Sequence, residues 1–224
     1  MSTTHPFVPL QYERRPEPEM MRRASEWLEE SQARRSTRQF SADPVARELI
    51  EHAILTAGTA PSGAHLQPWT FVAISNPALK ASIRQAAEEE ERQFYERRAT
   101  EEWLRDLAPL GTDQVKEHIT TAPWLVVLFK HTKRPRPDGS LAPTYYASES
   151  AGIAAGFFIA AIHRMGLCTL PHTPSPMGFL RSTLGRPDYE TPLLLMPVGY
   201  PAPDARVPAL ARKPLESISV FVED

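Results

Sequence analysis

The chain has 224 residues, of which 42% are hydrophobic and 23% are charged, and its formal net charge is -2. This balance is typical of an ordinary globular protein, and it offers no overall basic field for nucleic acid or an anionic membrane. The one cysteine, Cys168, excludes an internal disulfide and a cysteine-based metal cluster. The N-terminus shows no secretory signal, and the longest apolar run, residues 151–162, is shorter than the roughly 20 residues that span a bilayer. We therefore expect a cytoplasmic protein with no membrane or nucleic-acid partner.

The N-terminal third of the chain is expected to be an arm followed by two helices. Residues 1–20 are predicted as the arm, which passes from about Pro18 into a first helix that ends near Ala33. A second helix is predicted to begin at Pro44, with Asp43 as its cap, and to weaken at Gly58. The basic turn 34–38 separates the two.

The rest of the chain alternates between strands and helices. Strands are predicted at 68–75, 124–130, 167–170 and 193–199, with a short β-like segment at 218–222. Helices are predicted from the Asn76-Pro77 cap to about Glu102 and from Tyr145 to Met165, and the polar residues 131–141 are expected to form a surface loop. The second of these helices is apolar nearly all round, which is typical of a buried helix. We interpret the pattern as one α+β domain, a short sheet covered by helices, whose extended ends wrap around a partner subunit.

A basic turn is the first candidate for ligand binding. Arg34, Arg35, Ser36 and Arg38 place three guanidiniums and a hydroxyl within five residues, which suits a phosphate group. The alternative is a solvated basic turn with no ligand. Arg212, near the C-terminus, carries the same ambiguity.

Two loops carry further candidates. Ser62 and Gly63 lie in a tight loop before a strand, where the backbone can approach a flat or anionic ligand closely, although an ordinary connection fits equally well. Thr173 follows a strand and could donate a hydrogen bond to a cofactor ring, or it could be a turn residue.

A third set of residues suits a zwitterionic ligand. Glu91 and Tyr95 are four residues apart and share one helix face, and Lys116 follows them. A carboxylate, a phenol and an ammonium could hold a zwitterion together, while the alternative is a solvated acidic helix face. The scattered histidines show no metal-binding spacing, so no metal site is predicted, and no glycine-rich dinucleotide or P-loop motif is present.

These strings together resemble the nitroreductase superfamily and, within it, the iodotyrosine deiodinase family. The resemblance covers about residues 20–222 and is most specific in the string Thr56-Ala-Gly-Thr-Ala-Pro-Ser-Gly-Ala-His65, which follows Arg34-Arg-Ser-Thr-Arg38. It continues through Glu91, Tyr95 and Lys116 and through Pro197-Val-Gly-Tyr-Pro201.

The resemblance implies a nitroreductase-like α+β fold with a short, mostly antiparallel sheet flanked by helices. It also implies a domain-swapped homodimer with one FMN per subunit at the interface. Residues 21–224 would form the FMN domain, with a mobile lid at about 87–118 and a C-terminal extension at about 201–224.

The family pattern assigns roles to individual residues. The FMN phosphate and ring edge would be held by Arg34, Arg35, Ser36, Arg38 and Arg212. Ser62 and Gly63 would lie against the isoalloxazine, Pro171 and His172 would border it, and Thr173 would face its N5 atom. The substrate would be held by Glu91, Tyr95, Lys116 and the backbone N–H of Ala64, which would donate to the phenolate oxygen. Pro171 and His172 depart from the family pattern, which has threonines there.

The implied reaction is reductive dehalogenation of 3-halotyrosines, with iodine, bromine or chlorine as the halogen, or of a related halophenol. It would yield tyrosine and halide through reduced FMN and single-electron steps. The electron donor stays open, with NAD(P)H acting through a separate reductase as one source. Two alternatives are a general FMN nitro- or quinone reductase and a non-enzymatic binder of flavin or halotyrosine. The set of Glu91, Tyr95 and Lys116 argues against the first, because a promiscuous reductase gains nothing from holding a zwitterion.

Overall fold

The computed structural model describes residues 5–223, which divide into two compact units. The first unit extends to Arg34, and the second begins at Arg35. Within the first, residues 5–16 form neither helix nor strand, and α1 (Glu17–Ala33) occupies the range expected for the first helix. No residue of α1 is buried in the described chain.

The second unit is built on a four-stranded sheet in which all neighbours are antiparallel. Its strands, in spatial order, are β1 (Trp69–Ile74), β2 (Trp124–His131), β6 (Glu190–Gly199) and β5 (Cys168–Thr169). Side chains alternate along β2, so Val126 and Leu128 enter one hydrophobic cluster while Leu125, Val127 and Phe129 enter another. Helices must therefore cover both faces of the sheet, which confirms the expected mostly antiparallel α+β architecture.

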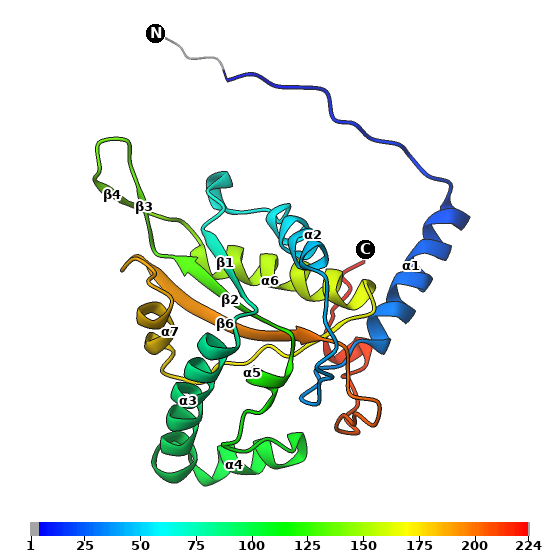
Figure 1. Ribbon diagram of the computed structural model, residues 1–224. Coiled ribbons are helices and arrows are strands. Elements are labelled where there is room, and N and C mark those ends of the chain that lie inside the picture. Colours follow the sequence, from blue (N-terminus) through cyan, green and yellow to red (C-terminus); the bar gives the residue numbers. More distant parts are fainter. Residues whose placement is uncertain (1–4, 224) are drawn as a thin grey trace. The chain divides into compact units, whose positions relative to one another are not determined.

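Helices lie on both faces of this sheet (Figure 1). One face is covered by α2 (Arg47–Gly58) and α6 (Ala147–Arg164), and the other by α3 (Pro77–Gln93), α5 (His118–Thr121) and α7 (Gly178–Thr183). Phe158 of α6 and Ile83 of α3 are fully buried in the two clusters. No helix within residues 5–223 combines the length and apolar character that crossing a bilayer requires.

Shorter elements complete the second unit. They are η1 (Gly63–His65), the π-helix η2 (Phe94–Arg98), α4 (Glu101–Leu107), η3 (Ala108–Leu110), the hairpin strands β3 (Lys133–Pro135) and β4 (Leu141–Pro143), and η4 (Leu215–Ser217). The surface loop predicted at 131–141 is therefore partly wrong, since its ends pair as a hairpin. The β-like segment 218–222 forms no strand.

The predicted start of the second helix is also wrong. Asp43 and Pro44 precede the helix, which begins at Arg47. The indole of Trp124 donates to the carbonyl oxygen of Val45 at 2.9 Å, and the Val45 side chain is buried in the core. The core therefore uses this carbonyl for a tertiary contact, and the helix starts after it.

The helix predicted from Asn76 to about Glu102 is interrupted. Asn76 caps it as expected, since its side chain accepts from the Leu79 N–H at 2.9 Å. The α-helix ends at Gln93, however, and continues as one π turn that closes through Ala99. Such turns are frequent at functional sites, because they reorient the side chains that follow.

The long apolar helix differs in one respect from the prediction. Its end at Gly166 is confirmed, with that glycine in the left-handed region at φ 78°. Only one face of α6 is buried, however, and Ile153 and Phe157 are 43% and 40% exposed. These residues form an exposed surface with Gly152 and Gly156, called here the outer face of α6, which none of residues 5–223 buries.

Candidate active site

A cavity of about 500 Å³ lies beside the end of α3 and contains most of the residues that the sequence indicates for substrate binding. Its lining is Arg38, Glu91, Phe94, Tyr95, Arg98, Trp103, Leu107, Thr112, Lys116, His118, Leu170, Pro171, His172, Thr173 and Ser175. Charged, aromatic and hydroxyl groups thus face one space, which is the composition expected of a site for a polar aromatic ligand.

Three segments of the chain supply the residues predicted for this site. The last turn of α3 carries Glu91, and the π turn that follows carries Tyr95. Lys116 lies two residues before α5. His172 is held at the sheet because its N–H and C=O both pair with the backbone of Leu195 in β6, at 2.9 Å each. Thr173 follows it, so the rigid sheet fixes this side of the cavity.

The Glu91 carboxylate has a nitrogen partner at each of its two oxygens. Its Oε2 lies 3.1 Å from the Lys116 ammonium, and its Oε1 lies 3.0 Å from Nε2 of His172. Burial raises the pKa of Glu91, but the hydrogen bond from His172 and the charge of Lys116 together outweigh burial and leave its pKa below the ordinary value. Glu91 is therefore an anion at neutral pH.

Lys116 is almost fully buried and has several partners. Its ammonium donates to Thr112 Oγ1 at 3.3 Å and to the carbonyl oxygen of Asp113, and it lies 5.9 Å from the ring centre of Tyr95. The Tyr95 hydroxyl donates to the Thr112 carbonyl oxygen at 3.0 Å. Burial raises the pKa of Tyr95, so the phenol stays protonated and can donate. The three residues predicted to hold a zwitterion therefore lie in one cavity.

Two histidines line the cavity together with Glu91. His118 and His172 meet edge to face with ring centroids 5.4 Å apart. Burial lowers the pKa of His118 to about 3, and burial also lowers the pKa of His172 despite its bond to Glu91. Both rings are therefore neutral at pH 7. Within residues 5–223, neither Nε2 of His118 nor Nδ1 of His172 has a hydrogen-bond partner.

Arg38 joins this cavity to a second one of about 380 Å³. The second cavity is lined by Ser36, Arg38, Gln39, Pro109, Leu110, Gly111, Arg206, Val207 and Pro208. Burial lowers the pKa of Arg38, and no hydrogen bond or ion pair to its guanidinium is found among the described residues. Burying a cation without a partner raises the free energy of the folded state, and a bound anion would offset this. The junction is therefore suited to an anion such as a phosphate. Arg35 donates to the carbonyl oxygen of Pro208 beside it.

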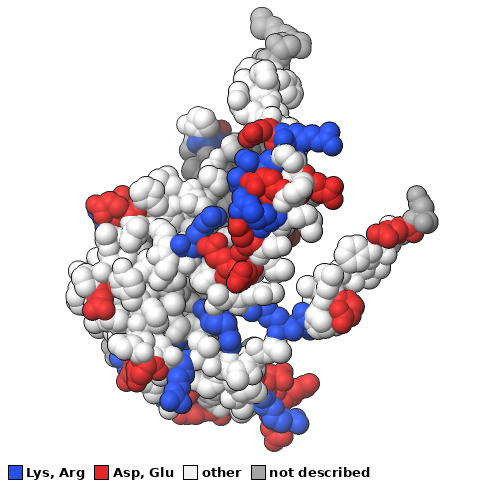
Figure 2. Space-filling model, turned by 90° about the vertical axis from the view of Figure 1, so that its right-hand side faces the viewer, with Lys and Arg blue, Asp and Glu red and all other residues white. Residues whose placement is uncertain are grey.

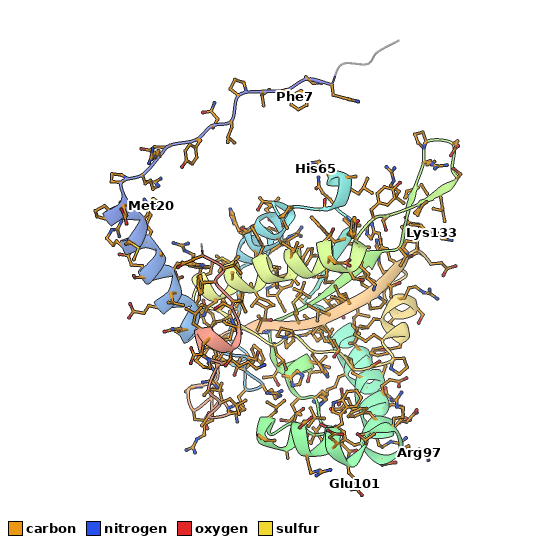
Figure 3. The ribbon with its side chains drawn as sticks, turned by 180° about the vertical axis from the view of Figure 1, so that it is seen from behind. Phe7, Met20, His65, Arg97, Glu101 and Lys133 are labelled. Atoms are coloured by element: carbon orange, nitrogen blue, oxygen red, sulfur yellow. The ribbon has the colours of Figure 1, made fainter. Side chains whose placement is uncertain are left out.

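The flavin-loop candidates lie elsewhere in the second unit. Ser62, Gly63 and Ala64 line neither cavity. Figure 3 places the adjacent His65 at the opposite end of this unit from Arg97 and Glu101, which follow the Glu91 segment. The single chain therefore does not bring this loop to the cavity.

The loop itself has a strained backbone and a close packing contact. Ala64 has a φ of 51°, and a Cβ added to Gly63 would lie 2.8 Å from the carbonyl oxygen of Tyr145. The N–H of Gly63 donates to Ser150 Oγ at 3.3 Å, and Ser62 Oγ accepts from the Gln67 N–H. The Gly63 position therefore requires glycine, and tertiary contacts hold the loop in its shape.

Two predicted phosphate ligands fall outside the cavities. Arg34 belongs to the first unit of the chain, and Arg212 is exposed on the C-terminal tail. Figure 2 shows acidic and basic side chains intermingled on the face that it displays.

Sequence reasoning missed several residues of the site. His118 and Thr112 flank Lys116 closely enough in the chain to have been found, but Arg206 lies far from the basic turn and carried no signal. Glu88 supports the site from outside the cavity, because it accepts from the backbone N–H of Lys116 at 2.8 Å. Such pairings depend on how separate segments pack.

Comparison with known proteins identifies the family. A model of the nitroreductase family matches residues 32–200. Iodotyrosine deiodinase of Haliscomenobacter hydrossis is 50% identical over 215 residues, which is 96% of either chain. Iodotyrosine deiodinase of Daphnia pulex is 47% identical over 95% of this chain and 71% of its own length. A crystal structure of oxidised iodotyrosine deiodinase bound to FMN and 3-iodo-L-tyrosine has a TM-score of 0.74 at 25% identity, covering 87% of this chain and all of that one. The chain therefore belongs to the nitroreductase family and, within it, to the iodotyrosine deiodinases.

Proposed function

We propose that this protein is an FMN-dependent enzyme that removes the halogen from 3-halotyrosines and releases tyrosine and halide. The observation that carries the proposal is the shared cavity of Glu91, Tyr95 and Lys116 beside Thr173. A carboxylate and an ammonium 3.1 Å apart can each exchange this contact for the opposite charge of an amino acid. The related structure that holds FMN and 3-iodo-L-tyrosine supports the same assignment.

The residues around the second cavity fit the phosphate of FMN. Arg38 offers a half-buried guanidinium at the junction of the two cavities, without a hydrogen bond or ion pair in the described part of the chain, and Arg35 and Ser36 flank it. We assign these residues to the phosphate and ring edge, together with Arg34, the first residue of the basic turn, and Arg212 in the C-terminal tail. Pro171, His172 and Thr173 would border the ring, with the Thr173 hydroxyl toward N5. When bound there, FMN supplies the electrons of the reaction.

A domain-swapped homodimer would complete the site. The loop that holds Ser62, Gly63 and Ala64 lies away from the cavity in one chain, so we assign it to the cavity of a second copy. The outer face of α6 and the exposed ends of the chain offer surface for such a partner, since Phe7 and Val220 are 97% and 88% exposed. Light scattering on the flavin-loaded protein tests this, and a monomer that retains FMN would contradict it.

The protein contributes positioning and charge to the reaction. Replacing the carbon–halogen bond by a carbon–hydrogen bond takes two electrons and one proton and releases halide. In our assignment Glu91 holds the substrate ammonium, while Lys116 and Tyr95 hold its carboxylate. The N–H of Ala64 donates to the phenolate oxygen and so favours the non-aromatic keto form, whose carbon–halogen bond accepts electrons more readily. We further propose that residues 87–118 close over the substrate, because they carry all three holding groups.

Turnover under anaerobic conditions tests the proposal directly. The dithionite-reduced enzyme should release halide from 3-iodo-, 3-bromo- and 3-chlorotyrosine and should act poorly on a nitroarene. Fast nitroarene reduction without halide release would instead support a general reductase, and flavin binding without either turnover would support a binding protein. The same assay with NADH or NADPH in place of dithionite shows whether a separate reductase is needed.

A further inference from the structure

His172 is not among the three groups assigned to the zwitterion, although it occupies one oxygen of the central carboxylate. Its Nε2 lies 3.0 Å from Oε1 of Glu91, while Lys116 lies 3.1 Å from Oε2. Each Glu91 oxygen therefore has one nitrogen partner. A substrate ammonium that binds Glu91 must approach beside these two nitrogens, and its charge repels that of Lys116.

The two partners differ in how readily they can leave. Lys116 ends a flexible side chain, and its ammonium has alternative acceptors in Thr112 and Asp113. The backbone N–H and C=O of His172 are both hydrogen-bonded to β6, and its side chain is only 12% exposed. Exchange with a substrate should therefore occur at Oε2, where Lys116 transfers to the substrate carboxylate, while His172 stays on Oε1.

The charge state of His172 suits this role. Glu91, Lys116 and Arg38 are the charged groups that act on His172, and the neutral His118 packs against its ring. Burial in this setting keeps the imidazole uncharged, so the bond to Glu91 requires the proton on Nε2. A neutral donor orients the carboxylate without cancelling its charge, which a lysine or arginine at this position would do.

We infer that His172 is a positioning residue that selects for the amino acid end of the substrate. It anchors Glu91 through Oε1 and leaves Oε2 and the full negative charge to the substrate ammonium. This inference rests on the proposed function, because it assumes that a halotyrosine occupies the cavity.

The test compares two probes on the oxidised, FMN-loaded enzyme. Dissociation constants for 3-iodotyrosine and 2-iodophenol are measured by the change in flavin fluorescence, and their ratio reports the amino acid end alone. His172→Ala should reduce the preference for 3-iodotyrosine, measured as the ratio of the two constants, by about tenfold or more, because an unanchored Glu91 loses the equivalent of one charged hydrogen bond to the ammonium. His172→Gln, which keeps a neutral N–H donor and cannot ionise, should restore the preference to within about threefold of wild type.

Other outcomes distinguish the ways in which the idea can fail. If His172→Ala loses FMN, His172→Thr gives the same comparison with a side chain suited to the extended backbone. An unchanged ratio in the alanine or threonine variant overturns the inference, as does an equal loss for both probes, which would indicate a merely structural role. Iodide release by the wild type is measured separately. If the wild type releases iodide but the His172 variants keep the wild-type ratio of dissociation constants, only the inference is refuted. If the variants change this ratio but the wild type releases no iodide, only the proposed function is refuted.

Discussion

The buried His118 should make the protein sensitive to mild acid. Its pKa is about 3 in the folded protein, because burial and the neighbouring His172 disfavour the charged ring, whereas an unfolded histidine titrates at about 6.5. Between these two values the unfolded state binds more protons than the folded state. The free energy of unfolding is therefore unaffected by His118 above pH 6.5, falls as the pH drops below it, and reaches its full loss below pH 3.

The size of the effect follows from the two pKa values. At pH 5 the unfolded ring is almost fully protonated and the folded ring is almost fully neutral, so the linkage costs about 2 kcal/mol relative to pH 7. His118 is only 5% exposed, so solvent screening reduces this figure little. Because a typical domain is stable by about 5–15 kcal/mol, this is a measurable fraction of the total.

Urea unfolding at about pH 7 and pH 5, with FMN held at one saturating concentration, measures this loss. His118→Gln removes the titrating ring, so it should lose about 2 kcal/mol less than the wild type between the two pH values, whatever its stability at pH 7. His52, which is exposed on α2, provides the matched control, and His52→Gln should keep the wild-type loss. Equal losses in the wild type and His118→Gln would show that the buried, neutral ring is not the cause.

Three further predictions concern the site. Lys116→Ala should weaken halotyrosine binding by about tenfold to a hundredfold, because one charged hydrogen bond is lost, and should weaken 2-iodophenol binding much less. Lys133→Ala, at an exposed lysine, is the control, and equal effects of Lys116→Ala on both ligands would refute the assignment. Gly63→Ala should destabilise the protein by about 1–3 kcal/mol in thermal unfolding, because its Cβ would lie 2.8 Å from a backbone oxygen, whereas Gly58→Ala meets nothing within 4 Å and should be neutral or stabilising. Halotyrosine should protect residues 87–118 from limited proteolysis, and equal cleavage with and without ligand would argue against a closing lid.

Elements with a strong local pattern were predictable in detail. The apolar run at 124–130 became the central strand β2, and Asn76 caps its helix through Leu79. Gly166 ends α6 in the left-handed conformation that glycine tolerates best. These features depend on residues that are close in the chain, so the sequence alone contains their physical cause.

Elements shaped by distant contacts were not predictable. The start of α2 depends on the Trp124 indole, which lies far along the chain and donates a hydrogen bond to the Val45 carbonyl oxygen. The π turn after Gln93 interrupts a segment whose composition favours an unbroken helix. The outer face of α6 has the same apolar character as its buried face, so periodicity could not show which side the single chain leaves exposed.

The family was recognisable from the resemblance of its sequence strings to known members, and the α+β class from the spacing of apolar residues. Side-chain chemistry showed which residues are able to hold a zwitterion and a phosphate. Which of these residues share one cavity depends on how the chain packs. The packing brings Glu91, Lys116 and His172 within hydrogen-bond distance from three different segments, and it leaves the Ser62–Ala64 loop apart. The physical reason is that the sheet and its covering helices set the distances between segments, and those distances determine which charges pair and which rings stay neutral.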